Sequence, residues 1–171
     1  MDRRFFVTAL AGAAGARMPF VAAAQRTSWR SQLLGAWSLI NAISLTDGKL
    51  KPWFGRTPPI TGILMYLDNG WMSVQIAGAR PETNPANFDD LPANDRTKWL
   101  GQYYAYYGRF EIDEAARVVT HHITDSLLPY ERAAVYRRKF DLHDNVLTLI
   151  TEPWQDGGKT GFNRFIWKRM A

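Results

Sequence analysis

Two adjacent histidines, His121 and His122, lie in the run VVTHHITDSLLPYE and are two of only three histidines in the chain. Imidazole titrates near neutral pH, so it can transfer protons, hold a metal or hydrogen-bond a ligand. The run is rich in β-formers, and neighbouring residues on a strand point to opposite faces. Its odd positions are apolar and its even positions carry hydroxyls: Val119, Ile123 and Leu127 against Thr120, Thr124 and Ser126. We therefore expect His121 to face a core and His122 to face solvent.

The turns on either side of this strand predict the neighbours of His121. A tight turn at 114–115 pairs Gly108 with His121, and a turn at 129–130 pairs Arg138 with it. Directly opposed side chains on one face have Cβ atoms about 4.5–5.5 Å apart. Both pairings agree with the inward face chosen from hydrophobicity. We therefore expect His121 beside Arg138, with Gly108 leaving open volume opposite.

The second turn is long enough to slip by one residue, which would put Lys139 opposite His121 instead of Arg138. The same alternation turns several aromatic side chains inward, and these together with Tyr66 are candidates to line a pocket: Tyr104, Tyr106, Phe110 and Tyr136. Tyrosines also close small barrels that hold no ligand, so a structural role stays open for all of them.

A buried guanidinium is costly unless a negative or strongly polar group meets it. Asp125 is the acid that the strand alternation places on the face of His121, two inward steps away. If Asp125 pairs with Arg138, the cluster is a structural polar plug. If it does not, an anionic ligand such as a carboxylate or an enolate is the natural counter-charge.

Other chemistries find little support. A metal site is not expected because no second inward histidine joins His121, and His143 lies in a turn. A serine triad is not expected because Ser126 lies on the face of His122, toward solvent. Cysteine is absent, which excludes disulfides and thiol catalysis. No glycine-rich phosphate loop appears, and we expect no cofactor.

The elements around these residues are mostly strands. A short helical lead spans 28–34, and alternating or β-rich runs separated by turn residues predict eight strands: 36–46, 60–67, 71–77, 103–113, 117–127, 134–142, 145–151 and 163–169. This pattern is typical of an antiparallel barrel or sandwich, and eight strands suit a small closed barrel. Two long connections, 47–59 and 78–102, are lids or plugs, and the second holds a short helix near 93–100.

The first 24 residues have the layout of an export signal. Arg3 and Arg4 precede a weakly apolar stretch, and small residues up to Ala24 provide a cleavage site. The paired arginines resemble a twin-arginine signal, although Asp2 departs from the usual residue. The apolar stretch is shorter than the ~20 residues that span a bilayer. We therefore expect a periplasmic or secreted protein with a single domain, 25–171.

Charge and composition restrict the partners. Removing the signal leaves 18 basic and 15 acidic residues, a net charge of +3 that is scattered along the chain. Nucleic acid is therefore not an expected partner, nor is a membrane once the signal is removed. The seven tryptophans, seven tyrosines and nine phenylalanines provide material for a core or a pocket. The expected assembly is a monomer or a weak homodimer.

An ordered set of motifs covers nearly all of the mature chain: LLGAWSLINA (33–42), TGILMYLDNGWMSVQ (61–75), YYAYYGRFEIDEAARVVTHHITDSLLP (103–129), YRRKFDLHDNVLTL (136–149) and FIWKR. In this order they resemble the lipocalin-like domain family of bacteria and fungi. The resemblance implies an all-β fold, an eight-stranded antiparallel barrel of the calycin type around a cavity. It implies less about function, because a fold does not dictate one.

Three functions remain open. In the first, the barrel binds a small, partly apolar molecule, with an anion as one option. Arg138 would then pair with its charge, His121 and Tyr106 would hydrogen-bond it, and 78–102 would cover the mouth. In the second, which the resemblance permits, the same pocket is a cofactor-independent isomerase, cyclase or hydratase. His121 would then be the general acid or base, and Arg138 and Tyr106 would stabilise an oxyanion or enolate. In the third, the barrel is filled and serves a structural or interaction role.

Overall fold

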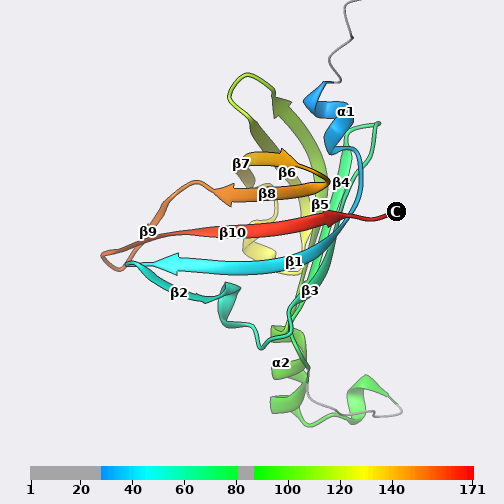
Figure 1. Cartoon of the computed structure of the whole chain (residues 1–171). Coiled ribbons are helices and arrows are strands. Elements are labelled where there is room, and N and C mark those ends of the chain that lie inside the picture. Colours follow the sequence, from blue (N-terminus) through cyan, green and yellow to red (C-terminus); the bar gives the residue numbers. More distant parts are fainter. Residues whose placement is uncertain (1–27, 81–86) are drawn as a thin grey trace, which may run out of the picture.

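The computed structural model describes residues 28–80 and 87–171, drawn in colour in Figure 1. The predicted export signal, 1–24, lies outside the described residues. Within them, no helix has both the length and the apolar character needed to cross a bilayer.

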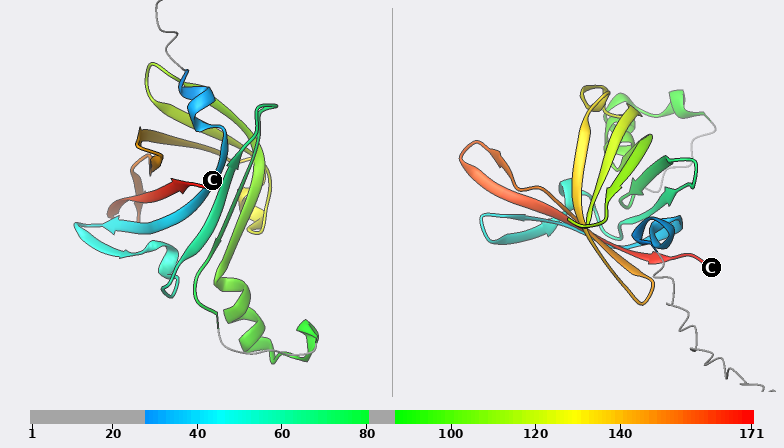
Figure 2. Two further views of the ribbon diagram at one scale, coloured as in Figure 1. Left: turned by 45° about the vertical axis from the view of Figure 1, so that its right-hand side comes forward. Right: turned by 90° about the horizontal axis from the view of Figure 1, so that it is seen from above.

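The core of the structure is a closed antiparallel barrel of eight strands. Hydrogen bonding runs in the order β1-β3-β4-β5-β6-β7-β8-β10, and pairing of β1 with β10 closes the cylinder (Figures 1 and 2). Its strands have these bounds: β1 Gly35–Thr46, β3 Thr61–Tyr66, β4 Trp71–Ala77, β5 Tyr103–Asp113, β6 Val118–Ser126, β7 Val135–His143, β8 Val146–Thr151 and β10 Lys159–Arg169. The expected eight-stranded barrel is confirmed.

Two short strands were not expected from the sequence. β2 (Lys49–Pro52) pairs with the end of β1, and β9 (Trp154–Asp156) pairs with the start of β10. Both belong to hairpins that extend past the closed barrel, at the left of Figure 1. All four residues of β2 are exposed, so no apolar alternation marks this strand in the sequence.

Helical segments lie at the two ends of the barrel (Figure 1). Ser28 caps α1 (Trp29–Leu33) by accepting a hydrogen bond from the N–H of Ser31, as expected of a helical lead. α2 (Ala93–Gly101) falls where a helix was expected, but none of its residues is buried. Three short 3₁₀ turns complete the described elements: η1 Trp53–Gly55, η2 Phe88–Asp90 and η3 Pro129–Glu131.

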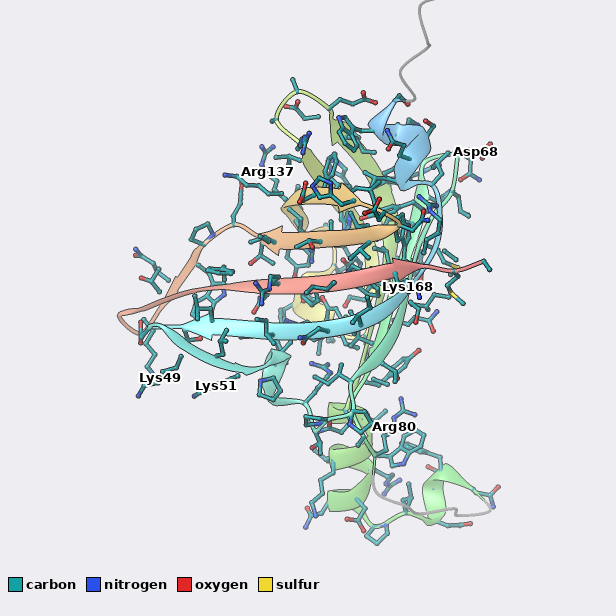
Figure 3. The ribbon with its side chains drawn as sticks, viewed as in Figure 1. Lys49, Lys51, Asp68, Arg80, Arg137 and Lys168 are labelled. Carbon is teal, nitrogen blue, oxygen red and sulfur yellow. The ribbon has the colours of Figure 1, made fainter. Side chains whose placement is uncertain are left out.

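The inner face follows the alternation of the strands. Side chains at every second position of β4, β5, β6 and β8 are buried, and β10 adds Phe165 and Trp167. His121 is fully buried, whereas His122 is partly exposed beside Glu111, as the alternation predicts. On β7, Arg138 is buried. Its neighbour Arg137 projects outward (Figure 3).

A β-bulge in β6 changes which face the end of this strand presents. Tyr107 pairs with Asp125 and Gly108 with Ile123, so Thr124 is an extra residue without a partner. A Cβ on Gly108 would overlap the carbonyl oxygen of His122. The expectation that Gly108 leaves open volume is therefore wrong: glycine here permits close approach of two backbones.

Beyond the bulge the predicted faces are reversed. Leu127 was expected inside and is 42% exposed, and Asp125 also points outward. Ser126 was expected outside, yet its hydroxyl bonds Glu131 in the interior. One extra residue on a strand exchanges its two faces, and the hydrophobic pattern of so short a segment does not reveal it.

Both predicted strand registers are displaced by two residues. His121 is opposite Phe110 and Tyr136, whereas Gly108 is opposite Ile123 and Arg138 is opposite Val119. The loops are longer than the tight turns assumed: the first spans 114–117, with Arg117 at φ 51°, and the second contains η3. A shift by two keeps the side chains on the β7 side of the bulge on their predicted faces, so Arg138 still lies beside His121.

Replacing Gly108 with alanine should destabilise the barrel by about 2–3 kcal/mol, because neither backbone can move away without breaking the ladder. Chemical denaturation measures this loss. Gly101→Ala is the matched control, since a Cβ at the end of α2 would meet nothing within 4 Å and its backbone lies outside the left-handed region. Equal effects of the two substitutions would contradict the account of the bulge.

Candidate functional site

His121 is at the centre of a hydrogen-bonded cluster inside the barrel. Its Nε2 lies 2.7 Å from Tyr66 Oη on β3, and its Nδ1 lies 2.8 Å from Tyr106 Oη on β5. Arg138 Nη1 on β7 approaches the same Nδ1 at 3.3 Å. Four strands therefore bring one imidazole, two phenols and one guanidinium together.

The contact with Arg138 decides the tautomer of His121. A guanidinium only donates hydrogen bonds, so Nδ1 must be an acceptor. Tyr106 also donates to Nδ1, and the ring proton lies on Nε2, where it is donated to Tyr66 Oη. Burial, and then the positive charge of Arg138, lower the pKa of His121 well below its usual value. His121 is thus a neutral, oriented group whose two nitrogens are both engaged.

The tyrosines of the cluster are neutral as well. Burial raises the pKa of Tyr106 to about 12, although the nearby Arg138 charge lowers it in part. Burial, reinforced by Tyr106, raises the pKa of Tyr66 well above its usual value. Neither phenol can serve as a base near neutral pH, and both act as hydrogen-bonding groups.

Arg138 has no carboxylate within 4 Å among the described residues. Its guanidinium carbon lies 5.0 Å from the ring centroid of Tyr136 and 5.9 Å from that of Tyr106. Asp125, the candidate counter-ion, instead lies 3.7 Å from Arg132 at the surface. Asp125 therefore does not neutralise Arg138, and the contacts of the buried guanidinium are with the imidazole of His121 and the rings of Tyr106 and Tyr136.

Glu131 is a buried carboxylate that the sequence analysis missed. Its Oε1 accepts hydrogen bonds from Tyr104 at 3.0 Å and Tyr136 at 2.7 Å, and its Oε2 accepts one from Ser126 at 2.7 Å. The residue lies in η3, where strand alternation no longer predicts which side chains turn inward. An acid next to the turn preceding β7 was the only available signal.

A second buried cation, Arg56, was also missed. It follows η1, stacks on Trp53 with its guanidinium carbon 4.5 Å from the ring, and donates to the carbonyl of Tyr103 at 3.2 Å. Burial lowers the pKa of Arg56, and Tyr104 and Glu131 act in the opposite direction. With His121 neutral, the charged side chains buried in the described residues are two arginines and one glutamate, a net charge of +1.

Two cavities meet at Arg138. The inner cavity, in the lumen next to His121 and Tyr106, has a volume of only about 20 Å³, room for one water-sized group. The outer cavity, of about 290 Å³, is at the mouth between η1 and the ends of β7, β8 and β10. Both are lined by the same four residues at their junction: Trp53, Tyr104, Arg138 and Phe165.

The predicted ligand residues divide between cavity wall and core. Five of them line one or both cavities: His121, Arg138, Tyr106, Tyr104 and Tyr136. The other three, Tyr66, Gly108 and Phe110, are packed away from both cavities, with the rings of Tyr66 and Phe110 only 4.7 Å apart. The lumen is therefore fuller than expected, and the open volume lies at the mouth.

The cover of the mouth comes from 47–59 rather than from 78–102. Trp53 of η1 is buried and packs edge-on against Tyr104 and Phe165, with centroids 5.0 and 5.1 Å away. Neither cavity is lined by the described residues of 78–102, whose helix α2 extends away from the barrel (Figure 1). No group of three or more potential metal ligands occurs in the residues that the structure describes.

Comparison with known proteins agrees with this architecture. The lipocalin-like domain family matches residues 34–170, almost the whole described chain. The chain belongs to this family.

Among solved structures, this lipocalin-like chain is similar to one titled "REP1-NXSQ fatty acid transporter". The two are 11% identical, the match covers 82% of this chain and 98% of the other, and the TM-score is 0.38. At that distance nothing about the ligand is carried over. No curated protein matches the sequence.

The neutral state of His121 predicts how stability depends on pH. Because its pKa is lower in the folded than in the unfolded chain, the unfolded chain takes up the proton first. The contribution of His121 to the free energy of unfolding should therefore be constant above pH ~6.5. Below that pH, the free energy of unfolding should decrease by up to about 1.4 kcal/mol for each pH unit. Urea unfolding between about pH 7.5 and 5, a range that spans this decrease, measures the slope.

NMR of the imidazole nitrogens provides the direct check, since His121 should remain the neutral Nε2–H tautomer at pH values of about 5.5. His143→Gln, at the exposed end of β7, is the control that assigns the imidazole signals. A protonated His121 in the folded protein at that pH would overturn the assignment.

Proposed function

We propose that this protein binds a small, partly apolar anion at the mouth of its barrel. The anionic group meets Arg138 at the junction of the two cavities, and the apolar part occupies the outer cavity. The volume of the outer cavity, the chemistry of its walls and the charge of Arg138 support the proposal.

The unpaired charge of Arg138 carries the proposal. A buried cation normally has an acidic partner, because its desolvation is otherwise uncompensated. Here Asp125 is turned outward, and Glu131 is already bonded by three hydroxyl groups. The interior keeps a net charge of +1, which one monoanion would balance.

The neighbours of Arg138 suit a positioning role. His121 holds one end of the guanidinium and, through Tyr66 and Tyr106, is itself fixed by two strands. Since both imidazole nitrogens bond protein groups, we assign His121 to orientation rather than to proton transfer. The aromatic walls at the mouth, formed by Trp53, Phe165 and Tyr136, provide apolar contact area for the rest of the ligand.

A filled barrel with a structural or interaction role is the second candidate. The small inner cavity favours it, because the core aromatic side chains leave little free volume. It differs from the first candidate in one respect: a filled barrel gives Arg138 no ligand to pair with, so its removal would change no affinity.

Replacing Arg138 with glutamine should weaken binding of naphthoate about tenfold or more, because a charge-assisted hydrogen bond is lost. Binding of the neutral analogue naphthalenemethanol should change by less than about twofold, since it lacks the charge. Titration calorimetry measures both affinities, and near-ultraviolet circular dichroism checks the fold.

Lys139→Gln is the matched control: it removes the same charge one residue along β7, from the outer face. It should change neither affinity. Equal losses for the two ligands on Arg138→Gln would contradict the anion site, and so would a folded wild-type protein that binds neither ligand at millimolar concentration.

We also propose that the chain is exported, on the basis of its first 24 residues. Expressed in a bacterium with a twin-arginine pathway, the protein should be recovered from the periplasm with Gln25 as its first residue. Lysine at both Arg3 and Arg4 should keep it in the cytoplasm, as intact-mass measurement of each fraction would show. Export of that variant in full yield would contradict a twin-arginine signal, and recovery of the uncleaved wild type only in the cytoplasm would contradict export.

A further inference from the structure

The indole N–H of Trp167 is a buried donor without an acceptor. Trp167 lies on the inner face of β10, opposite Leu39 of β1 and Leu147 of β8, and is 1% exposed. Its Nε1 has no hydrogen-bond partner among the described residues. By contrast, Nε1 of the equally buried Trp37 donates to the carbonyl of Leu33 at 2.9 Å. Buried donors are normally paired, so the unpaired one calls for an acceptor.

Trp167 lines the inner cavity together with Arg138. Of the side chains that have a buried, unpartnered nitrogen, Trp167 is the one that belongs to this cavity within the described part of the chain. Indole and guanidinium only donate, and the single acceptor nitrogen of His121 is already used by Tyr106 and Arg138. The inner cavity therefore has one unmatched donor, the indole N–H of Trp167, beside the cation of Arg138, and an acceptor oxygen placed there would meet both.

We propose that the ligand is a carboxylate, one oxygen of which enters the inner cavity and accepts from Trp167 Nε1–H while Arg138 binds the same group. This rests on the proposed function and narrows it to one class of anion. The cavity has room for one oxygen, about the size of a water. A carboxylate is planar and can present a single oxygen there, whereas a sulfonate or a phosphate monoester carries three oxygens around a tetrahedral centre.

The rest of the ligand follows from the junction of the cavities. Trp53 and Phe165 line both cavities and their rings are in contact, so a group attached to the carboxylate passes into the outer space where the Trp53 ring turns aside. That passage favours a flat or unbranched apolar group next to the carboxylate. The ligand class is therefore a monocarboxylate whose apolar part fits about 290 Å³.

The indole signal of Trp167 in the full mature chain provides the test. In ¹⁵N-labelled protein, naphthoate should shift the Trp167 indole proton downfield, because the proton gains a hydrogen bond. The Trp37 indole proton, which already donates to Leu33, should not move. Naphthalenesulfonate should leave the Trp167 signal in place and bind more weakly by about tenfold.

Affinities of variants complete the test. Trp167→Phe keeps the ring and removes the donor, and it should weaken naphthoate binding about tenfold while leaving naphthalenemethanol unaffected. Trp71→Phe, on the outer side of β4 where the ring stacks on Arg109, is the matched control and should change neither affinity. If Trp167→Phe does not fold, the wild-type indole shift alone decides the question.

The outcomes separate this inference from the proposed function. If Arg138→Gln weakens naphthoate binding but the Trp167 signal is unmoved and sulfonate binds as well as carboxylate, the carboxylate inference is wrong and the anion site stands. If Arg138→Gln has no effect either, both are wrong. A downfield shift of Trp167 with carboxylate and not with sulfonate supports both.

Discussion

The contact between the Arg138 guanidinium and the neutral imidazole of His121 is the constraint on which the rest of the interior depends. A cation in this position keeps the imidazole unprotonated, fixes its tautomer and directs its remaining proton to Tyr66. Because the imidazole is neutral, Arg138 is the one charged group of this cluster. Protonated histidine beside arginine would place two like charges in the lumen, which the fold avoids by burial.

The strands deliver these groups through ordinary sheet geometry. β3, β5, β6 and β7 each contribute one polar side chain to the cluster, and aromatic or aliphatic residues surround it on the inner faces of the same strands. The bulge at Thr124 adds a second polar group by turning Ser126 toward Glu131. One glycine, Gly108, makes room for that bulge. The bulge in β6 thus gives the buried carboxylate of Glu131 one of its three hydroxyl partners.

Much of the interior could be predicted from the sequence, because the alternation of side chains between the two faces of a strand does not change when the register shifts by two residues. The period of two put His121 inside, His122 outside and Arg138 on the inner face, and a shift of two residues in both pairings left those faces unchanged. The alternation is interrupted by the bulge in β6, so the faces predicted for Asp125, Ser126 and Leu127 are wrong. The prediction of open volume at Gly108 is wrong for a related reason. The sequence shows that a side chain is absent, but not that the backbone of His122 occupies the space.

Residues outside the regular strands were beyond such reasoning. Glu131 lies in a 3₁₀ turn, and Arg56 and Trp53 lie in or next to another, where no short period relates neighbouring side chains to a common face. The size of the lumen was equally out of reach. It depends on how the large rings of Trp37, Tyr66 and Trp167 pack across the barrel, and a strand pattern gives their direction but not the volume they leave.

The placement of Trp53 has a kinetic consequence for any molecule that reaches the inner cavity. Its indole is wedged edge-on between Tyr104 and Phe165, and these three rings stand at the boundary of the two spaces. A ligand can then enter or leave the inner cavity only when the Trp53 ring rotates away from these neighbours. Arg56, stacked on the Trp53 ring, opposes that rotation. The residence time of the ligand would be set by the rate at which the Trp53 ring rotates, so a ligand of low affinity could still dissociate slowly.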